Sequence, residues 1–488
     1  MPAILRKLAC RLILIAVLWP TPYVRAAEPV RIDGRRELFV DDYLIDTQSG
    51  TTLELQQPRE REIVFVHDTP WEGCTSTYHT IIRDGDTYRM YYRGGQFDET
   101  NQKSMHPEVF CYAQSNDGIH WTRPDLGIVE FKGSKDNNII LSGGYSSHNL
   151  APFVDANPNC KPDEKFKAVG GTKGGLVTFK SADGIHWDKL SAKPVITKGY
   201  FDSLNTALWD VTRGKYLEFH REYRDKVRDI MTCSSTDFEH WSEPEWLEYT
   251  GAPHQHLYTN AIVAYDRAPQ LLIGLPMRYV PGRNPEKHSQ DGVSDVGFMT
   301  SRDGKMFHRW NEAFVRPGQQ SDRWVTRNNL PARGMVETKP DVPDAPPEVS
   351  FYATEGYYRG PATRLRRYTV RLDGFVSLSA PPSGGEMVTK PLLFAKSNEP
   401  AKIWINFATS AVGSIKCELQ AADGKPLPGF TLDDCDEIFG DSINRAITWG
   451  GKSDVSASAE KPVRMRFVMK DADLFALQIR PDADKDAK

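Results

Sequence analysis

Ser115–Trp121 (SNDGIHW) and Ser181–Trp187 (SADGIHW) share the five consecutive residues DGIHW. Two weaker copies follow, STDFEHW at 235–241 and SRDGKMFHRW at 301–310, and LDGFV at 372–376 is a degenerate fifth copy. The intervals between copies are 66, 54, 66 and 70 residues, counted between Asp117, Asp183, Asp237, Asp303 and Asp373. Intervals of this length fit the blades of a β-propeller with extended loops.

Each copy follows a pattern of alternating strands. In the first repeat, three candidate strands precede the motif, at 78–82, 88–92 and 109–113. Trp121 begins a fourth strand, and later repeats have corresponding first strands near Asn149, Ser203, Tyr258 and Asn329. Five four-stranded units without helical spacers predict an all-β fold with a five-bladed β-propeller.

The pattern changes after about residue 380, where PPSGG at 381–385 indicates a linker. Alternating stretches at 402–407, 414–419 and 464–468 then predict a small C-terminal β-sandwich. We expect the early segment 37–40 to complete the last blade. The predicted organisation is a signal peptide at 1–26, a propeller at 27–380, a β-sandwich at 385–481 and a disordered tail at 482–488.

The N-terminus has the features of a secretory signal. Arg6, Lys7 and Arg11 precede a short apolar run at 12–19, and VRA at 24–26 offers a cleavage site. The apolar run is short for a bilayer span, so we expect cleavage after Ala26 in preference to an uncleaved anchor. The mature protein is then secreted or periplasmic, and not held in a membrane.

The composition narrows the range of partners. The 488 residues carry a formal net charge of −4, which argues against nucleic-acid binding through phosphate neutralisation. We find no dinucleotide, phosphate-loop or zinc motif in a supporting context, and predict no cofactor and no metal. The cysteines show no metal-ligand spacing, and Cys417 with Cys435 is the first disulfide pair to test.

Propeller geometry turns the repeat map into a map of the site. Residues before first strands and after second strands meet at one mouth of the central channel, whereas the DGIHW turns join third to fourth strands near the rim. His120 and His186 are therefore expected to be structural, with Asp117 and Asp183 bonding turn amides. The predicted substrate-binding residues at the mouth are Asp68, Arg93, His148, Arg221, Arg228, Asp229, Asn260, Arg278, Asp295 and Asn328.

Two carboxylates across such a mouth suit glycoside hydrolysis, one as nucleophile or base and one as acid. Asp202 and Glu72 lie just before first strands and Glu355 ends a second strand, so these are the catalytic candidates. Capping a turn or balancing an arginine is the alternative role for each. The arginines can clamp an anionic group, and the aromatic residues expected near the mouth are Trp71, Tyr92, Tyr200, Phe201, Tyr258 and Trp324.

Four phrases carry a resemblance to a known family: ELFVDDYLI at 37–45, RMYYR at 89–93, the DGIHW repeats, and LYTN at 257–260. With them the chain resembles glycoside hydrolases of families 32 and 43, and most closely exported bacterial proteins termed glycosyl hydrolase family 32 N-terminal-like. The resemblance implies a five-bladed propeller that acts on carbohydrate.

The motifs also depart from that family. Glu72–Thr75 (EGCT) stands where the family has an N-D-P-type aspartate motif, and Phe201–Ser203 (FDS) matches the R-D-P-type motif only loosely. The family's E-C-type acid has no counterpart, and Tyr258–Asn260 (YTN) occupies the comparable place. The DGIHW turn is similar to the sialidase Asp-box, but sialidases have six blades where this chain has five repeats.

Four functions remain open from the sequence. The first is an exported glycoside hydrolase acting as a monomer on an extracellular poly- or oligosaccharide, with an anionic glycan suiting the arginines. The second is a non-catalytic glycan-binding propeller, which the missing family acid favours. A sialidase-like enzyme and a protein-interaction propeller rank lower, since the mouth is rich in acids and arginines.

Overall fold

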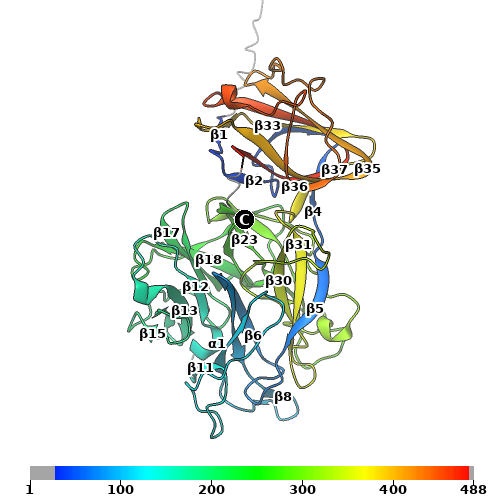
Figure 1. Cartoon of the computed structure of the whole chain (residues 1–488). Coiled ribbons are helices and arrows are strands. Elements are labelled where there is room, and N and C mark those ends of the chain that lie inside the picture. The colour runs from blue at the N-terminus through cyan, green and yellow to red at the C-terminus, as the bar shows by residue number, and fades with distance from the viewer. Residues whose placement is uncertain (1–27, 145, 483–488) are drawn as a thin grey trace, which may run out of the picture.

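The computed structural model describes residues 28–144 and 146–482, and its regular structure is nearly all β-strand (Figure 1). The prediction of an all-β chain is confirmed. The helical segments in these residues are α1 (Ser146–Asn149), η1 (Pro162–Glu164), η2 (Ser321–Trp324) and η3 (Ser456–Ser458). None of these helices has the length and apolar character needed to cross a membrane. The predicted signal peptide and residues 483–488 of the predicted tail lie outside the described residues.

The first three sheets are four-stranded antiparallel meanders, each in the order of the chain. The first contains β6 (Thr77–Asp84), β7 (Thr87–Gly94), β10 (Val109–Ser115) and β11 (Ile139–Ser142). The second contains β12 (Ala151–Val154), β13 (Phe166–Thr172), β14 (Gly175–Ser181) and β15 (Asp188–Lys189). The third contains β16 (Thr206–Asp210), β17 (Lys215–Arg224), β18 (Val227–Ser235) and β19 (Glu245–Trp246). A short pair, β8 (Phe97–Asp98) with β9 (Lys103–Ser104), extends from the first sheet.

The fourth repeat is divided into two hydrogen-bonded sheets. One contains β21 (Leu257–Thr259), β24 (Met277–Val280) and β25 (Val293–Val296). The other contains β20 (Glu248–Thr250), β22 (Val263–Tyr265), β23 (Ala268–Gly274), β26 (Met299–Ser301) and β27 (Met306–Arg309). The division falls where Ala261 adopts a φ of 45°, a conformation that interrupts a regular strand.

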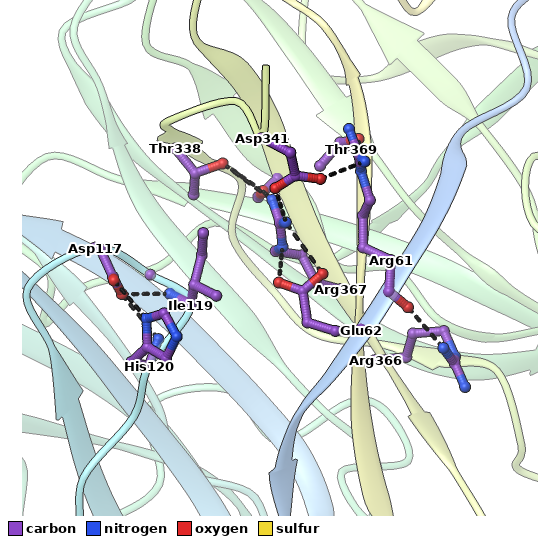
Figure 2. Close-up of polar contacts among 12 residues, drawn as sticks. Arg61, Glu62, Asp117, Ile119, His120, Thr338, Asp341, Arg366, Arg367 and Thr369 are labelled. Carbon is purple, nitrogen blue, oxygen red and sulfur yellow. Dashed lines mark hydrogen bonds and ion pairs between the residues drawn. The ribbon is translucent and has the colours of Figure 1, made fainter. Parts of the chain in front are cut away.

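The sheet of the fifth repeat is completed by a strand from the N-terminal part of the chain. Its strands are β28 (Leu330–Pro331), β29 (Val336–Thr338), β30 (Glu348–Glu355), β31 (Arg364–Arg371) and β5 (Arg59–Val66). β5 pairs antiparallel with β31, and Figure 2 shows the side chains of Arg367 and Glu62 facing each other across this pair. The pairing of β5 with β31 therefore joins the beginning of the strand series to its end.

The prediction that residues 37–40 complete the last blade is wrong. β2 (Arg36–Leu38) pairs instead with β37 (Val463–Arg480), at the far end of the chain. The charged sequence REREIVFV of β5 fits the edge position, because its acids meet arginines of β31. The segment 37–40 (ELFV) is largely apolar and belongs to the ten-stranded sheet system described next, in whose core Phe39 is fully buried.

The remaining strands form one ten-stranded sheet system that combines both ends of the chain, drawn as the upper part of Figure 1. Its N-terminal members are β1 (Val30–Arg31), β2, β3 (Ile45–Ser49) and β4 (Thr52–Leu55). Its C-terminal members are β32 (Val376–Ala380), β33 (Gly385–Thr389), β34 (Leu392–Leu393), β35 (Lys402–Ala421), β36 (Asp441–Ala446) and β37. An apolar core shared with the fourth and fifth repeats includes Leu38, Phe298, Phe351 and Phe375.

All six described cysteines are free. Cys417 and Cys435 nevertheless lie side by side, because the Cys417 amide donates to the Cys435 sulfur at 3.3 Å. Burial raises the pKa of both thiols, so neither is a reactive thiolate in this state.

Candidate functional site

Residues from the first strands of all five repeats meet at the centre of the strand series. The apolar cluster there contains Tyr78 of β6, Ala151 of β12, Leu204 next to β16, Tyr258 of β21 and Leu330 of β28. Because each of these strands is the innermost of its sheet, their meeting point lies on the axis around which the sheets are arranged. A site built on this point can draw residues from every repeat.

Tyr78 and Tyr258 both lie at irregularities of strand pairing. The register of β6 against β7 shifts between Thr77 and Thr80, and that of β21 against β24 shifts between Leu257 and Thr259. Tyr78 also has a φ of 55°, which is unfavourable for an aromatic residue. β-bulges of this kind re-aim side chains and are frequent beside functional sites. In this chain they bring two tyrosines together, since Tyr78 and Tyr258 pack in the same buried cluster.

Arginines surround the two tyrosines. The guanidinium carbons of Arg221, Arg228 and Arg327 lie 5.0, 5.6 and 5.9 Å from the centre of the Tyr258 ring. That of Arg93 lies 4.8 Å from the centre of the Tyr78 ring. We call Tyr78, Tyr258, Tyr357, Arg93, Arg221, Arg228 and Arg327 the arginine–tyrosine cluster.

Tyr357 links two of these cations. It accepts a hydrogen bond from Arg93 Nη2 at 2.9 Å, and its ring centre is 5.8 Å from the Arg327 guanidinium carbon. The Nε atoms of Arg93, Arg221 and Arg228 are buried and have no hydrogen-bond partner among the described residues. Buried donors are normally paired, so unpaired donors on three neighbouring arginines are a feature that an anionic ligand would explain.

The surroundings of Tyr258 and Tyr78 shift the pKa values of the two phenols in opposite directions. Burial raises the pKa of Tyr258, but the cations of Arg327 and Arg221 outweigh burial and hold this pKa below its usual value. Burial and the neighbouring Tyr258 instead hold the pKa of Tyr78 well above its usual value. Such a pair suits proton transfer, because one member favours releasing its proton while the other keeps it.

Asp202 is the exposed carboxylate beside the cluster. Its side chain is 61% exposed and forms an ion pair with Arg221. Its backbone carbonyl accepts hydrogen bonds from Tyr78 Oη at 3.3 Å and from His148 Nε2 at 3.0 Å. The segment that carries Asp202 therefore lies against the tyrosine pair, and its carboxylate points to solvent.

His148 extends the polar network on the other side. Its Nδ1 atom lies 2.6 Å from Glu108 Oε2, and Glu108 is also 3.3 Å from Arg93 Nη1. Burial raises the pKa of Glu108, but His148 and Arg93 outweigh burial and hold it at about 2. Glu108 is thus an ionised partner of these cations and not a proton donor near neutral pH.

Five of the predicted site residues come together at this cluster: Arg93, His148, Asp202, Arg221 and Arg228. Tyr258 was expected among the aromatic residues of the mouth, but as a stacking surface. Tyr78, Tyr357, Glu108 and Arg327 were not among the predicted site residues. The position of Tyr78 at the start of the first inner strand could have identified it as a site residue. The alternation of a strand, however, does not reveal a bulge.

Glu72 lies elsewhere, in a small pocket with Asp68. Its side chain is fully buried, accepts from Tyr92 Oη and pairs with Arg123 at 2.8 Å. Burial raises the pKa of Glu72, but His67, Arg123 and Tyr92 outweigh burial and lower it. Asp68 is exposed and 3.9 Å from Arg123. The pocket measures about 240 Å³ and is also lined by His67 and Gln96.

Glu355 is likewise held by arginines. It is 1% exposed, and Arg366 donates to both of its carboxylate oxygens, at 2.6 and 3.2 Å. Arg323 lies 3.5 Å away on another side. This geometry gives Glu355 a structural ion pair within the last sheet.

The other predicted binding residues have internal partners. Asp229 is buried against Arg224 at 2.6 Å, and Arg278 pairs with Asp295 through two hydrogen bonds. Asn260 accepts from Thr206 at 2.7 Å, while Asn328 accepts from the amide of Tyr357 at 2.8 Å. Arg278 and Asp295 also line a cavity of about 470 Å³ with Arg283, Arg316 and Trp324.

A further cavity of about 570 Å³ lies between the last sheet and the ten-stranded system. It is lined by Arg61 and Arg371 among others, but Arg61 pairs with Asp341 and Glu348, and Arg371 pairs with Asp441. These two arginines are therefore already neutralised, in contrast to Arg228 and Arg327 of the arginine–tyrosine cluster. Within residues 28–144 and 146–482, no group of three or more His, Cys, Asp or Glu side chains is arranged to hold a metal ion.

The DGIHW turns lie away from the cluster, each after the third strand of its sheet. Asp117 accepts from the amides of Ile119 and His120, both at 2.8 Å, and from His120 Nδ1 at 2.7 Å (Figure 2). Trp121 Nε1 donates to the Gly118 carbonyl at 3.1 Å. Tyr352 of the last sheet donates to the same carbonyl at 2.6 Å, so the turn joins neighbouring sheets.

No protein-family model matches the chain. An uncharacterised protein of Mycobacterium tuberculosis is 40% identical over 114 residues, which are 23% of this chain and 34% of that protein. A second uncharacterised protein of that species is 40% identical over 62 residues, 13% of this chain and 20% of that protein. The chain thus spans a third or less of the length of these two curated relatives.

Solved structures of carbohydrate-active proteins share a partial likeness with the chain. They include a β-1,2-mannobiose phosphorylase from Listeria innocua (11% identity, 66% of this chain and 98% of that one, TM-score 0.44). An N-acetylgalactosamine deacetylase from F. plautii has 13% identity over 67% and 97%, with a TM-score of 0.43. A fructofuranosidase from Schwanniomyces occidentalis has 12% identity over 86% and 97%, with a TM-score of 0.37. These agree with the resemblance that the sequence indicated, but at such scores they carry no argument about activity.

Proposed function

We propose that this chain is a carbohydrate-active propeller that binds an anionic saccharide at the arginine–tyrosine cluster and cleaves its glycosidic linkage there. The observation that carries the proposal is the gathering of Arg93, Arg221, Arg228 and Arg327 around two buried phenols. Arginine forks match carboxylates and sulfates, and flat tyrosine rings suit sugar faces. Within this proposal the five repeats are five blades, and the ten-stranded system is a β-sandwich.

The charge balance at the cluster supports an anionic ligand over a neutral one. Asp202 and Glu108 offset part of the positive charge of the four arginines, through Arg221 and Arg93 respectively. Arg228 and Arg327 contact aromatic rings, and Arg327 donates to Tyr358 Oη at 2.8 Å, a neutral partner. A carboxylate or sulfate on the sugar would complete the pairing of these two cations.

The same geometry weakens the hydrolytic scheme with Glu72 and Glu355 as catalytic carboxylates. Both are buried and paired with arginines outside the cluster, which leaves Asp202 as the exposed carboxylate beside the tyrosines. A second candidate function is therefore binding without cleavage, favoured because neither Glu72 nor Glu355 belongs to the cluster that Asp202 borders.

Calorimetric titration tests the proposal directly. Uronate trisaccharides are expected to bind, whereas the same trisaccharides with carboxyl groups reduced to alcohols bind at least tenfold more weakly. Equal affinity for charged and neutral forms would refute anion recognition. Binding without any release of shorter saccharides would favour the second candidate function.

We also propose that the protein acts outside the cytoplasm, as the charged and apolar pattern of residues 1–26 indicates. Fractionation of an expressing bacterium and N-terminal sequencing of the exported form test this. Intact residues 1–26 on a cytoplasmic product would contradict it.

A further inference from the structure

We infer that the arginine–tyrosine cluster cleaves its saccharide by β-elimination at a 4-linked uronate, with Tyr258 as the base and Tyr78 as the acid. This inference rests on the proposed function, because it needs an anionic sugar at the cluster. It goes beyond it by naming the substrate class and a reaction other than hydrolysis.

The first support is the placing of the two phenols. Each lies at a bulge of an inner strand, and they come from repeats that are 180 residues apart in the chain, at positions 78 and 258. The backbone of Tyr78 is strained, with a φ of 55°, and strain of this kind concentrates at functional sites. Two irregular strands that converge on one pair of packed tyrosines are more than packing requires.

The second support is the distribution of charge. β-Elimination from a uronate begins with removal of the proton on C5, which builds negative charge on the neighbouring carboxylate. Fixed cations that face developing charge stabilise such a transition state. Arg221, Arg228 and Arg327 all lie within 6 Å of the Tyr258 ring centre, so a base at Tyr258 acts beside the groups that would neutralise the carboxylate.

The third support is the opposite acidities of the phenols. The lowered pKa of Tyr258 favours its phenolate, and the raised pKa of Tyr78 keeps that phenol protonated. A more acidic phenol beside a less acidic one suits elimination, which needs a base and an acid at neighbouring positions.

The reaction balances without a co-reactant. Tyr258 Oη takes the C5 proton, and the electron pair of that C–H bond forms the C4=C5 double bond. The C4–O4 bond breaks, and Tyr78 Oη gives its proton to the departing oxygen. After the products leave, Tyr258 releases its added proton to water and Tyr78 takes one from water, which restores both phenols. The products are a 4,5-unsaturated uronate and a new reducing end.

The experiment uses the whole chain with galacturonate, glucuronate and mannuronate trisaccharides, and follows the products by ultraviolet absorbance and mass spectrometry. The expected product of at least one of them absorbs in the ultraviolet as an unsaturated uronate, and the fragments together have the mass of the substrate. Saturated fragments whose summed mass exceeds that of the substrate by one water would overturn the inference while leaving the proposed function intact. Binding of these sugars without cleavage would also overturn it, and absence of binding would refute the proposed function itself.

Two variants assign the residues. Tyr258→Phe and Tyr78→Phe are each expected to lower kcat at least 100-fold, the size of a general acid–base contribution, with the Kd for the trisaccharide changed less than fivefold. Tyr43→Phe is the matched control, since it removes a phenol outside the cluster and keeps the ring that lies 4.2 Å from the Arg302 guanidinium carbon. Cleavage within threefold of the unmodified chain in either variant would overturn the assignment of that residue. The product made by the wild-type chain identifies the reaction class even if neither variant folds.

Discussion

The guanidinium carbon of Arg221 lies 5.0 Å from the centre of the Tyr258 ring, and the same guanidinium pairs with the exposed carboxylate of Asp202. One cation thus contacts a buried phenol on one side and a solvent-facing anion on the other. Arg221 therefore already binds one carboxylate, and we expect it to bind the carboxylate of a ligand in the same way.

Arg221→Gln is expected to weaken binding of a uronate trisaccharide about tenfold to 100-fold. Charged hydrogen bonds contribute about 1.5–3 kcal/mol, and about 1.4 kcal/mol is tenfold in affinity. Calorimetry measures the change, with Arg31→Gln as control because Arg31 is exposed and pairs with Asp33 and Glu460. Unchanged affinity in Arg221→Gln would contradict a role of this arginine in anion binding.

Asp202→Asn is expected to strengthen uronate binding severalfold, because it removes an anion that competes for Arg221. The same change should make binding more sensitive to added salt, since one more cation is then free to attract the ligand. Titrations at two ionic strengths measure both effects. Weaker binding in Asp202→Asn would show that the carboxylate contacts the sugar directly.

Glu72→Gln is expected to lower the free energy of unfolding by about 1.5–3 kcal/mol, since the buried Glu72 side chain loses its charged hydrogen bonds with the partly exposed Arg123. The folded fraction should keep its affinity for the saccharide. Urea denaturation measures the loss, and Glu245→Gln serves as control because its pair with Lys305 is exposed. A stable variant that binds but no longer cleaves would return Glu72 to the catalytic residues.

Asp117→Ala is expected to lower the free energy of unfolding by about 1–2 kcal/mol, as for the loss of a residue that caps backbone amides. His120→Ala should change stability little, because the His120 side chain is 85% exposed. Thermal melts of the two variants distinguish these roles. Equal losses would mean that the histidine contributes as much as the aspartate.

The stability of the chain should fall as the pH drops from about 6.5 to 4. Burial lowers the pKa of His67 to about 4, so the unfolded chain binds more protons than the folded chain in this range, and protons favour unfolding. Urea denaturation at several pH values should show a shallower slope for His67→Gln. An identical slope would assign the acid sensitivity to other groups, such as the neighbouring His79, whose pKa burial also holds well below its usual value.

The strand repeat could be predicted from sequence because DGIHW marks each turn after a third strand. Sorting residues by strand end also placed Arg93, Arg221 and Arg228 near one another. Glu72 shows the limit of that method: its partner Arg123 is 51 residues away, and only folding reveals that the carboxylate is neutralised. β5 was missed for the same reason, since its acids look solvent-exposed until they meet β31.

Tyr78 shows a second limit. Its segment alternates like any buried strand, and the extra residue that turns its phenol toward Tyr258 leaves no mark in that alternation. Bulges are set by how two strands pair, and a single strand's sequence does not contain its partner's register.

The ten-stranded system joins β1–β4 to strands that follow residue 376, with the whole ring of sheets inserted between them. During synthesis the first strands emerge from the ribosome more than 300 residues before β37, against which β2 pairs. They must remain unpaired for that time, as open sheet edges that invite association with other chains. Because the N-terminal strands are made first, we expect the first 30 described residues to need protection from association with other chains until β37 has been made.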